Sequence, residues 1–308
     1  MSPAVRLAIR LCLVGLVLGA VLALGLRERS AAPVPFDLSA SPAPSAPPTR
    51  IVSLVPNVTE MIFAIGAGDR LVGVSSFDEY PPEVKRIARV GALLDPDLER
   101  IFALRPDLVV VYASQRDLEK QLRGAGIDTF SYRHGGVSDI TAVMRELGKR
   151  LGIDARADAA ATKIEADLDR IRARVGGRGR PRVLLVFGRE KGALRGIYAS
   201  GGYGFLHDLV AIGGGENVFA DVKRESVQAS TEMILARAPD VIVEIHGGEV
   251  LSPEAAAREA RVWSALSSLP AVRNHRVYVL SGQDLVSPGP RIVQAAARIA
   301  RAIHPERP

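Results

Sequence analysis

The side chains in this sequence that could bind a metal are two histidines and one aspartate, each in a loop after a predicted strand. They are His134, His246 and Asp284. Imidazole together with carboxylate is a ligand set that suits zinc, manganese or iron. The three residues lie far apart in the sequence without the spacing of a metal-binding motif, which favours ordinary polar loop residues. Whether His134 or His246 contacts a metal stays open at this point.

Motifs of common enzyme chemistry are missing from the sequence. It contains no GxxxxGK[ST] phosphate loop, no GxSxG nucleophile elbow, no HExxH and no intact GxGxxG after the first predicted strand. The glycines from Gly213 to Gly215 follow a predicted helix and are typical of a helix end rather than of a phosphate site. We therefore expect a protein that is not an enzyme, with no catalytic residue and no resident cofactor.

Two glutamates, Glu99 and Glu232, occupy the same place in two related segments. Leu98 to Tyr112 reads LERIFALRPDLVVVY, and Thr231 to Ile245 reads TEMILARAPDVIVEI. Each segment predicts a short helix that ends at Pro-Asp and is followed by a buried strand. A carboxylate in a first helical turn is stabilising by about 0.3 to 1 kcal/mol through the helix dipole, so the repeat alone assigns these glutamates no function. The shared register does predict a duplicated architecture.

The segment between the two copies predicts one long helix from Asp154 to Val175. Asp154 is the expected N-cap, and Gly176 and Gly177 are the expected end. Apolar residues recur at steps of three and four and form one stripe, made of Ala161, Ile164, Leu168, Ile171 and Val175. A helix of this length is a rod of roughly 30 Å, which is long enough to join two lobes.

On either side of this helix the sequence predicts a parallel α/β lobe. RIVSLVP begins the first and RVLLVFG the second, and we expect lobes at residues 50–153 and 177–308 with the connecting helix at 154–176. The 308 residues, 47% hydrophobic and 5% aromatic, suit two α/β domains. Ligands of open α/β sheets bind outside the carboxyl ends of the strands, so the two lobes should share one cleft.

The N-terminal segment has the pattern of an export signal. Arg6 and Arg10 precede an apolar run from Leu11 to Leu26, so residues 1–29 are expected to be a signal peptide or an uncleaved membrane anchor. Residues 30–49 are rich in Ala, Pro and Ser and predict an extended linker. Cys12, the only cysteine, lies in the apolar run, so the exported part has no disulfide. The net charge of +6 comes from scattered arginines with no basic run beside aromatics, which does not indicate nucleic acid binding.

Several sequence blocks together resemble a known family. In chain order they are RIVSLVPNVTE, VGVSSFDEYPPEV, LERIFALRPDLVVVY, GGGENVF, ILARAPDVIVEI and SPGPRIV. They are similar to the helical-backbone class of substrate-binding proteins of ABC importers, and most of all to the members that bind vitamin B12. The resemblance spans Arg50 to His304. It implies an α/β protein with two Rossmann-like lobes with parallel sheets, joined by a single long rigid helix, and limited closure on the ligand.

The resemblance also implies a function. It predicts a periplasmic or extracytoplasmic monomer that captures a vitamin B12-like corrinoid and delivers it to an ABC importer permease dimer with its ATPase, with the N-terminal segment possible as a tether to the cytoplasmic membrane. The alternatives are a haem or ferric-siderophore binding protein of the same class, or a membrane-tethered sensory or scaffold module. In the family, two glutamates at the positions of Glu99 and Glu232 pair with arginines of the permease.

The candidate ligand-binding residues follow from strand ends and from the resemblance. They are Pro56, Asn57, Phe77, Leu93, Tyr112, Tyr203, His246, Gln283 and Asp284. Residues at the positions of Phe77 and Tyr112 line the corrin pocket in the family, whereas Leu93 stands where the vitamin B12 binder has tryptophan. For haem, the axial ligand would be Tyr112, His134 or Tyr203, and the sequence selects none of them.

Overall fold

The computed structural model describes residues 46–305 apart from residue 249. The expected signal or anchor at 1–29 lies outside these residues, and so does most of the expected linker at 30–49. In the range that is described, no helix combines the length and the apolar character needed to cross a membrane.

The first sheet is wholly parallel. Its strands are β1 (Ile51–Ser53), β2 (Leu71–Val74), β3 (Ala88–Arg89), β4 (Leu108–Tyr112) and β5 (Asp128–Tyr132), in the order β3-β2-β1-β4-β5. The helices of this part are α2 (Pro56–Ala64), α3 (Leu98–Ala103), α4 (Arg116–Gly124) and α5 (Val137–Leu151). In β4 the residues from Leu108 to Val111 are fully buried, as expected for a central strand of a parallel sheet. We call this sheet with its helices the first lobe.

The second sheet is mixed. Its strands are β6 (Arg182–Gly188), β7 (Ile197–Ser200), β8 (Glu216–Asn217), β9 (Ser226–Ala229), β10 (Val241–His246) and β11 (Val277–Ser281). The order is β11-β10-β6-β7-β9, with β8 beside β6, and β7 runs antiparallel to both of its neighbours. The expectation that the second sheet is parallel is therefore wrong for β7. Only residues 189–196 separate β6 from β7, and so short a connection suits antiparallel strands, whereas parallel strands need a crossover of a dozen residues or more.

The second sheet and its helices form what we call the second lobe. The helices are α7 (Gly204–Ile212), α8 (Thr231–Arg237), α9 (Pro253–Val262), α10 (Pro270–Arg273) and α11 (Ile292–Ile303). Residues 44–308 form one compact unit, and the boundaries of the lobes within it stay a prediction.

The two repeat segments fold alike, down to the backbone at the turn. Arg105 and Ala238, at equivalent positions after α3 and α8, both adopt positive φ, at 47° and 42°. The next aspartate in each copy then accepts a backbone N–H at the start of the neighbouring strand: Asp107 from Arg50 and Asp240 from Arg182, both at 2.9 Å. The Pro-Asp turn therefore attaches each central strand to the first strand of its lobe.

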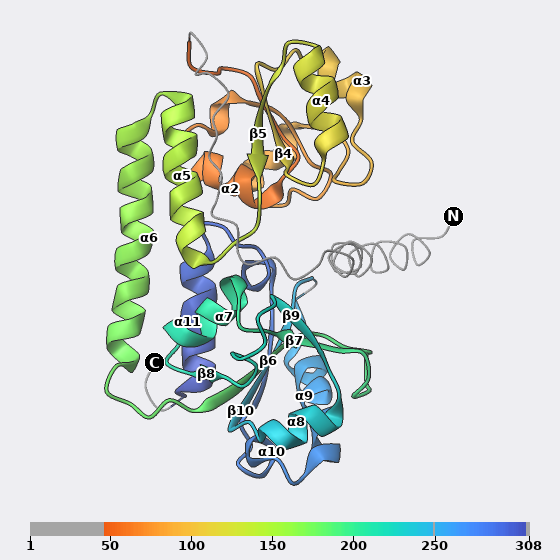
Figure 1. The fold of residues 1–308 in the computed structure, drawn as a ribbon, viewed down its shortest axis with the longest axis vertical. Coiled ribbons are helices and arrows are strands. Elements are labelled where there is room, and N and C mark those ends of the chain that lie inside the picture. Colours follow the sequence, from red (N-terminus) through yellow and green to blue (C-terminus); the bar gives the residue numbers. More distant parts are fainter. Residues whose placement is uncertain (1–45, 249, 306–308) are drawn as a thin grey trace. The chain divides into compact units, whose positions relative to one another are not determined.

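Helix α6 spans Asp154–Val175, as the sequence predicts. Ile153 rather than Asp154 stands in the N-cap position, so the expected cap is wrong by one residue. Figure 1 shows α6 running beside α5 and α11. Because α5 belongs to the first lobe and α11 to the second, α6 packs on both lobes.

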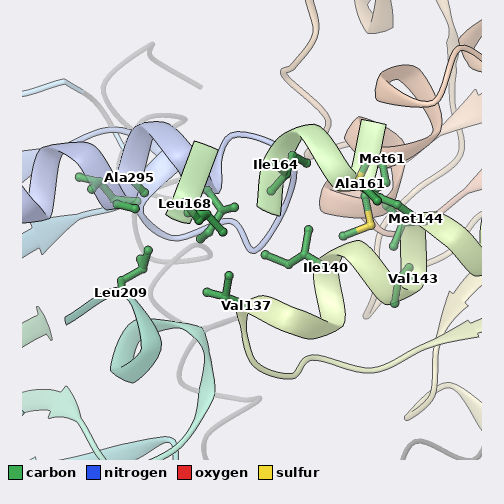
Figure 2. Packing of buried hydrophobic residues seen from close by; sticks show 14 of the residues in the cluster. Met61, Val137, Ile140, Val143, Met144, Ala161, Ile164, Leu168, Leu209 and Ala295 are labelled. Carbon is green, nitrogen blue, oxygen red and sulfur yellow. The ribbon is translucent and has the colours of Figure 1, made fainter. Parts of the chain in front are cut away.

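Burial along the stripe of α6 explains how the helix connects the lobes. Four of its five apolar residues are buried, and Val175 is half-buried. Figure 2 shows Ile164 and Leu168 within one cluster with Ile140 of α5, Leu209 of α7 and Ala295 of α11. Burial of each large aliphatic side chain contributes about 1.5 to 3 kcal/mol, so a movement of one lobe against the other would expose costly apolar surface.

Candidate ligand-binding site

The two lobes contact each other at Asn57, close to the carboxyl end of β1. This residue follows β1, and its Nδ2 donates to the carbonyl oxygen of Pro288, in the segment after β11, at 3.0 Å. The same amide donates to the hydroxyl oxygen of Tyr132, at the end of β5. Asn57 is buried and Pro56 is the first residue of α2, so both predicted residues lie where β1 leads into α2.

Three rings lie together where β4 and β5 end. The ring of Tyr112 is 6.1 Å from that of Tyr132 and 5.8 Å from that of His134, and the rings of Tyr132 and His134 are 5.3 Å apart. Burial raises the pKa of both tyrosine hydroxyls, so they stay protonated. Tyr132 is buried, whereas Tyr112 is half-buried and His134 is exposed, so these two rings are the ones that could contact another flat ring.

Large apolar side chains are exposed in the loops after β2 and β3 of the first lobe. Phe77 and Tyr80, in the loop after β2, are each 44% exposed, and Leu94 is 58% exposed. Tyr80 and Leu94 were not among the predicted residues. Their signal was available in the sequence, since both are large apolar residues in loops that follow strands. Exposed apolar groups beside strand ends are typical of a binding surface.

Leu93 is tied to the end of β4 through one glutamine. Gln115 accepts from the backbone N–H of Tyr112 at 2.9 Å and donates to the carbonyl oxygen of Leu93 at 3.0 Å. The predicted residues Leu93 and Tyr112 are therefore held together, and the exposed Leu94 follows directly.

In the second lobe, one predicted ligand-binding residue is exposed and two others form contacts within the protein. Tyr203 precedes α7 and is 37% exposed, so it can meet a ligand. Asp284 accepts from one guanidinium nitrogen of Arg298 at 2.9 Å with each of its oxygens, and Gln283 accepts two backbone N–H groups through its carbonyl. These contacts indicate that Gln283 and Asp284 hold the turn after β11.

His246 ends β10 and belongs to a network of charged side chains. Its Nε2 lies 2.7 Å from Oε1 of Glu244, which is 1% exposed. The other oxygen of Glu244 accepts from Trp263 at 2.8 Å and from Arg189 at 3.0 Å. Burial raises the pKa of Glu244, but the donors His246, Trp263 and Arg189 outweigh burial and bring it below its usual value. Glu244 was missed by the sequence analysis, although a carboxylate in the apolar run VIVEI is the signal for it.

The predicted metal-binding candidates have separate partners. His134 contacts Tyr132, His246 contacts Glu244, and Asp284 contacts Arg298. Within residues 46–305, leaving aside residue 249, no group of three or more His, Cys, Asp and Glu side chains is arranged to hold an ion.

A buried ion pair joins the lobes beside this edge. Arg291, at the start of α11, donates from two nitrogens to both oxygens of Glu60 in α2, at 2.6 and 2.8 Å. The side chains are 16% and 6% exposed. The guanidinium also lies 4.3 Å from the ring centre of Tyr80, a cation–π distance. The loop that carries Phe77 and Tyr80 is thus coupled to the contact between the lobes.

Asp78 lies directly after Phe77 and is 2% exposed. Among the described residues neither carboxyl oxygen has a hydrogen-bond partner, and burial raises the pKa of Asp78 to about 7. Between the ordinary pKa and 7 the folded state therefore binds more protons than the unfolded state, so this group makes the protein less stable as the pH rises through that range.

We expect Asp78→Asn to stabilise the protein at pH 8 by up to about 4 kcal/mol, because each pKa unit corresponds to about 1.4 kcal/mol. Near pH 4 the same substitution should have little effect, since the carboxyl is then protonated in the folded state. Urea unfolding at both pH values measures the difference, with Asp69→Asn, a change at an exposed carboxylate, as control. An effect of Asp78→Asn that does not change with pH would contradict the prediction.

Glu99 and Glu232 are exposed and lie in the first turns of α3 and α8. Each helix is capped by the residue two before the glutamate: Asp97 accepts from Arg100 and Ser230 accepts from Met233. Within the described part of the chain, neither glutamate forms a salt bridge. Glu232 accepts a hydrogen bond from the hydroxyl of Thr231, and both exposed carboxylates can still meet cations outside the chain.

Two hollows lie away from this edge. One of about 280 Å³ is lined by residues of β11 and α11, and one of about 320 Å³ by residues of α2, α5, α6, α11 and the segment before α11. None of the predicted ligand-binding residues lines either hollow.

The sequence of the chain matches a family of known proteins. Residues 51–283 match the family of periplasmic binding proteins, and the chain belongs to this family. It is 31% identical over 264 residues to an ABC transporter substrate-binding lipoprotein of Bacillus subtilis, which covers 84% of this chain and 81% of the relative. It is 32% identical over 258 residues to the vitamin B12-binding protein of Salmonella typhimurium, which covers 82% and 90%.

Solved structures support the same class. The periplasmic vitamin B12-binding protein of Vibrio cholerae has a TM-score of 0.69 and 26% identity, and the match covers 83% of this chain and 97% of that one. A periplasmic haem-binding protein from Roseiflexus has a TM-score of 0.68 and 26% identity, covering 83% and 98%. The chain is a periplasmic substrate-binding protein of an ABC importer, with the α/β fold of two lobes and one long helix that the sequence predicts.

Proposed function

We propose that this protein captures a vitamin B12-like corrinoid between its lobes and delivers it to an ABC importer permease. The observation that carries the proposal is the group of aromatic rings of the first lobe, formed by Tyr112, Tyr132 and His134. The exposed Phe77 precedes Asp78, which is close enough to Tyr112 to act on its pKa. A corrin ring is large and flat, and aromatic side chains bind such a surface without needing a charge. The vitamin B12-binding relatives support the choice within the class.

Haem is the second candidate, and a ferric siderophore is the third. The haem-binding structural neighbour and the presence of Tyr112, His134 and Tyr203 favour haem. A tyrosine ligand to ferric iron must lose its proton, and the raised pKa of Tyr112 opposes this. We therefore assign Tyr112 to contact with the ring of the ligand rather than to coordination of iron.

The experiment that ranks these ligands is retention after desalting. The purified protein is incubated with hydroxocobalamin, haemin or a ferric siderophore, passed through a desalting column and examined by absorption. We expect one equivalent of corrinoid to stay with the protein. Tight binding of haemin with no retained corrinoid would overturn the first choice within the class.

Removal of either the exposed ring of Phe77 or the half-buried ring of Tyr112 should weaken binding. Phe77→Ala and Tyr112→Ala each remove an aromatic contact worth about 0.5 to 1.5 kcal/mol or more, so each should lower the affinity for cobalamin by roughly tenfold. Calorimetric titration measures the change. Phe102→Ala is a matched control, because Phe102 is 40% exposed but lies on α3, whose chain leads into β4 at the edge opposite the strand ends. Unchanged affinity in both variants would place the ligand elsewhere.

Delivery requires partners outside this chain. We propose that the protein acts as a monomer on a permease dimer with its ATPase, in the extracytoplasmic space, and that residues 1–29 direct it there as a cleaved signal or a retained membrane tether. A sensory or scaffold role of the same fold is the alternative. Growth on limiting cobalamin distinguishes the transport role from the sensory role. Deletion of a transport protein should abolish this growth. Deletion of a sensor should leave the growth intact, provided that the importer is expressed.

The lobes should move little on ligand binding. The cluster along α6 and the ion pair of Glu60 with Arg291 both resist a change in the position of the lobes. Small-angle scattering curves with and without ligand should therefore superpose. A clear decrease in the radius of gyration would contradict this expectation.

A further inference from the structure

The two repeat segments also agree in the large apolar side chains that their helices expose. Phe102 in α3 and Leu235 in α8 stand at equivalent positions, and they are 40% and 39% exposed. Each lies three residues after the glutamate of its segment, Glu99 or Glu232. Residues three apart are neighbours on one face of a helix, so each helix presents a carboxylate beside a large apolar side chain.

The pattern of burial along α3 and α8 explains why both groups face solvent. Ile101 and Ile234, at equivalent positions, are fully buried, whereas the residues on either side of each isoleucine are exposed. One isoleucine thus attaches each helix to its lobe. The caps of the two helices, Asp97 and Ser230, are equivalent as well. The same local structure therefore places the same two chemical groups on the surface of both lobes.

Chance and duplication do not explain these exposed apolar residues. A single exposed apolar side chain is ordinary on a protein surface, but here two occur at matching positions beside matching glutamates. The two segments carry different residues, phenylalanine and leucine, so the residue itself was not simply copied while its apolar character is the same. A polar residue at positions so exposed would hardly change the stability of the fold. The apolar character is what contact with a partner requires.

The chemistry of the two surfaces also defines the symmetry of the partner. Because each lobe presents a carboxylate and an apolar side chain on a helix built alike, a partner that fits both lobes must offer one complementary patch twice. Two copies of the same subunit provide such a pair of patches. The chain belongs to the periplasmic binding proteins and is related to a substrate-binding lipoprotein of an ABC transporter, and a permease dimer is a partner of this symmetry.

We infer that Phe102 and Leu235 are apolar anchors for docking, one on each subunit of the permease dimer. This inference rests on the proposed function of delivery to that permease. Each anchor enters an apolar recess beside the cation that meets the neighbouring glutamate. The glutamates guide association and fix its register, and the anchors supply a part of the affinity that salt does not screen.

The test measures binding of the purified protein to its importer, the permease with its ATPase, in lipid nanodiscs. Phe102→Ala with Leu235→Ala should lower the affinity by roughly a hundredfold, about tenfold for each side chain, because the two positions lie on separate lobes and their effects add. In about 1 M sodium chloride, where the screening length is about 3 Å, wild type should still bind and this variant should not. Ligand affinity and the melting temperature should stay as in wild type, because both side chains are exposed and alanine favours a helix.

Exchange of the two residues is the matched control. Phe102→Leu with Leu235→Phe keeps a large apolar side chain at both positions, so its affinity for the importer should stay close to that of wild type. Normal binding by the double alanine variant would overturn the inference, and so would equal losses in the alanine and exchange variants. Self-association of wild type, abolished in an alanine variant that binds the importer normally, would identify a second copy of this chain as the partner instead. Failure of wild type itself to bind the importer would reject delivery, which is the proposed function.

Discussion

Uptake should be abolished when Glu99 and Glu232 are both replaced by arginine. If the two lobes rest on a permease dimer, one carboxylate from each lobe meets arginine on a different subunit, and charge reversal turns two attractions into two repulsions. Ligand affinity and the melting temperature should hardly change, because both side chains are exposed and exposed pairs contribute about 0 to 1 kcal/mol to stability. Uptake of labelled cobalamin in cells, with titration of the same purified variants, measures both effects.

The chain offers a matched control for this double variant. Asp117 and Glu254 are also exposed acidic residues in first helical turns, of α4 and α9, so Asp117→Arg with Glu254→Arg makes the same change in charge. The control should keep uptake, and a single replacement at Glu99 or Glu232 should reduce it only in part. Normal uptake by the variant with both Glu99 and Glu232 reversed would reject the docking role.

Arg291→Ala should destabilise the protein strongly. Removal of the guanidinium leaves Glu60 buried without its partner, and breaking a buried pair in this way costs about 3 to 5 kcal/mol. For a domain of this size that corresponds to a decrease in melting temperature of roughly 10 °C. Calorimetry or circular dichroism measures the shift.

A comparison with an exposed pair shows whether burial is the cause. Arg195 and Glu190 form an ion pair with side chains 75% and 54% exposed, so Arg195→Ala should cost less than about 1 kcal/mol. In the double variant Glu60→Gln with Arg291→Ala the unpaired charge is absent, so much of the stability should return. Equal effects of Arg291→Ala and Arg195→Ala would show that the contact between the lobes contributes little.

The sequence predicted those parts of the fold that depend on local pattern. The apolar stripe predicted α6, and Asp154 with Gly176 predicted its limits. The repeat around Pro-Asp predicted two equivalent helix and strand pairs. The antiparallel strand β7 was not predicted, because its four residues, Ile197–Ser200, lie in a Gly-rich stretch that is typical of a loop. The direction of a strand depends on how the chain turns between β6 and β7, and the local pattern of apolar residues does not show this turn.

The candidate site was predicted only where a side chain stands at a strand end. Phe77 and Tyr112 could be found in this way, and so could His246. The roles of Glu60, Arg291 and Glu244 depend on partners far away in the sequence, such as Glu60 and Arg291, which are 231 residues apart. A single sequence does not show such pairs, although a glutamate inside an apolar strand or helix is a sign that a partner exists.

The structure of the protein crystallised with hydroxocobalamin is the most direct test of ligand capture between the lobes. We expect the corrin ring to contact Phe77 and Tyr112 of the first lobe. A corrinoid bound in the hollow beside Tyr278 and Arg298, or no bound corrinoid at saturating concentration, would contradict the account.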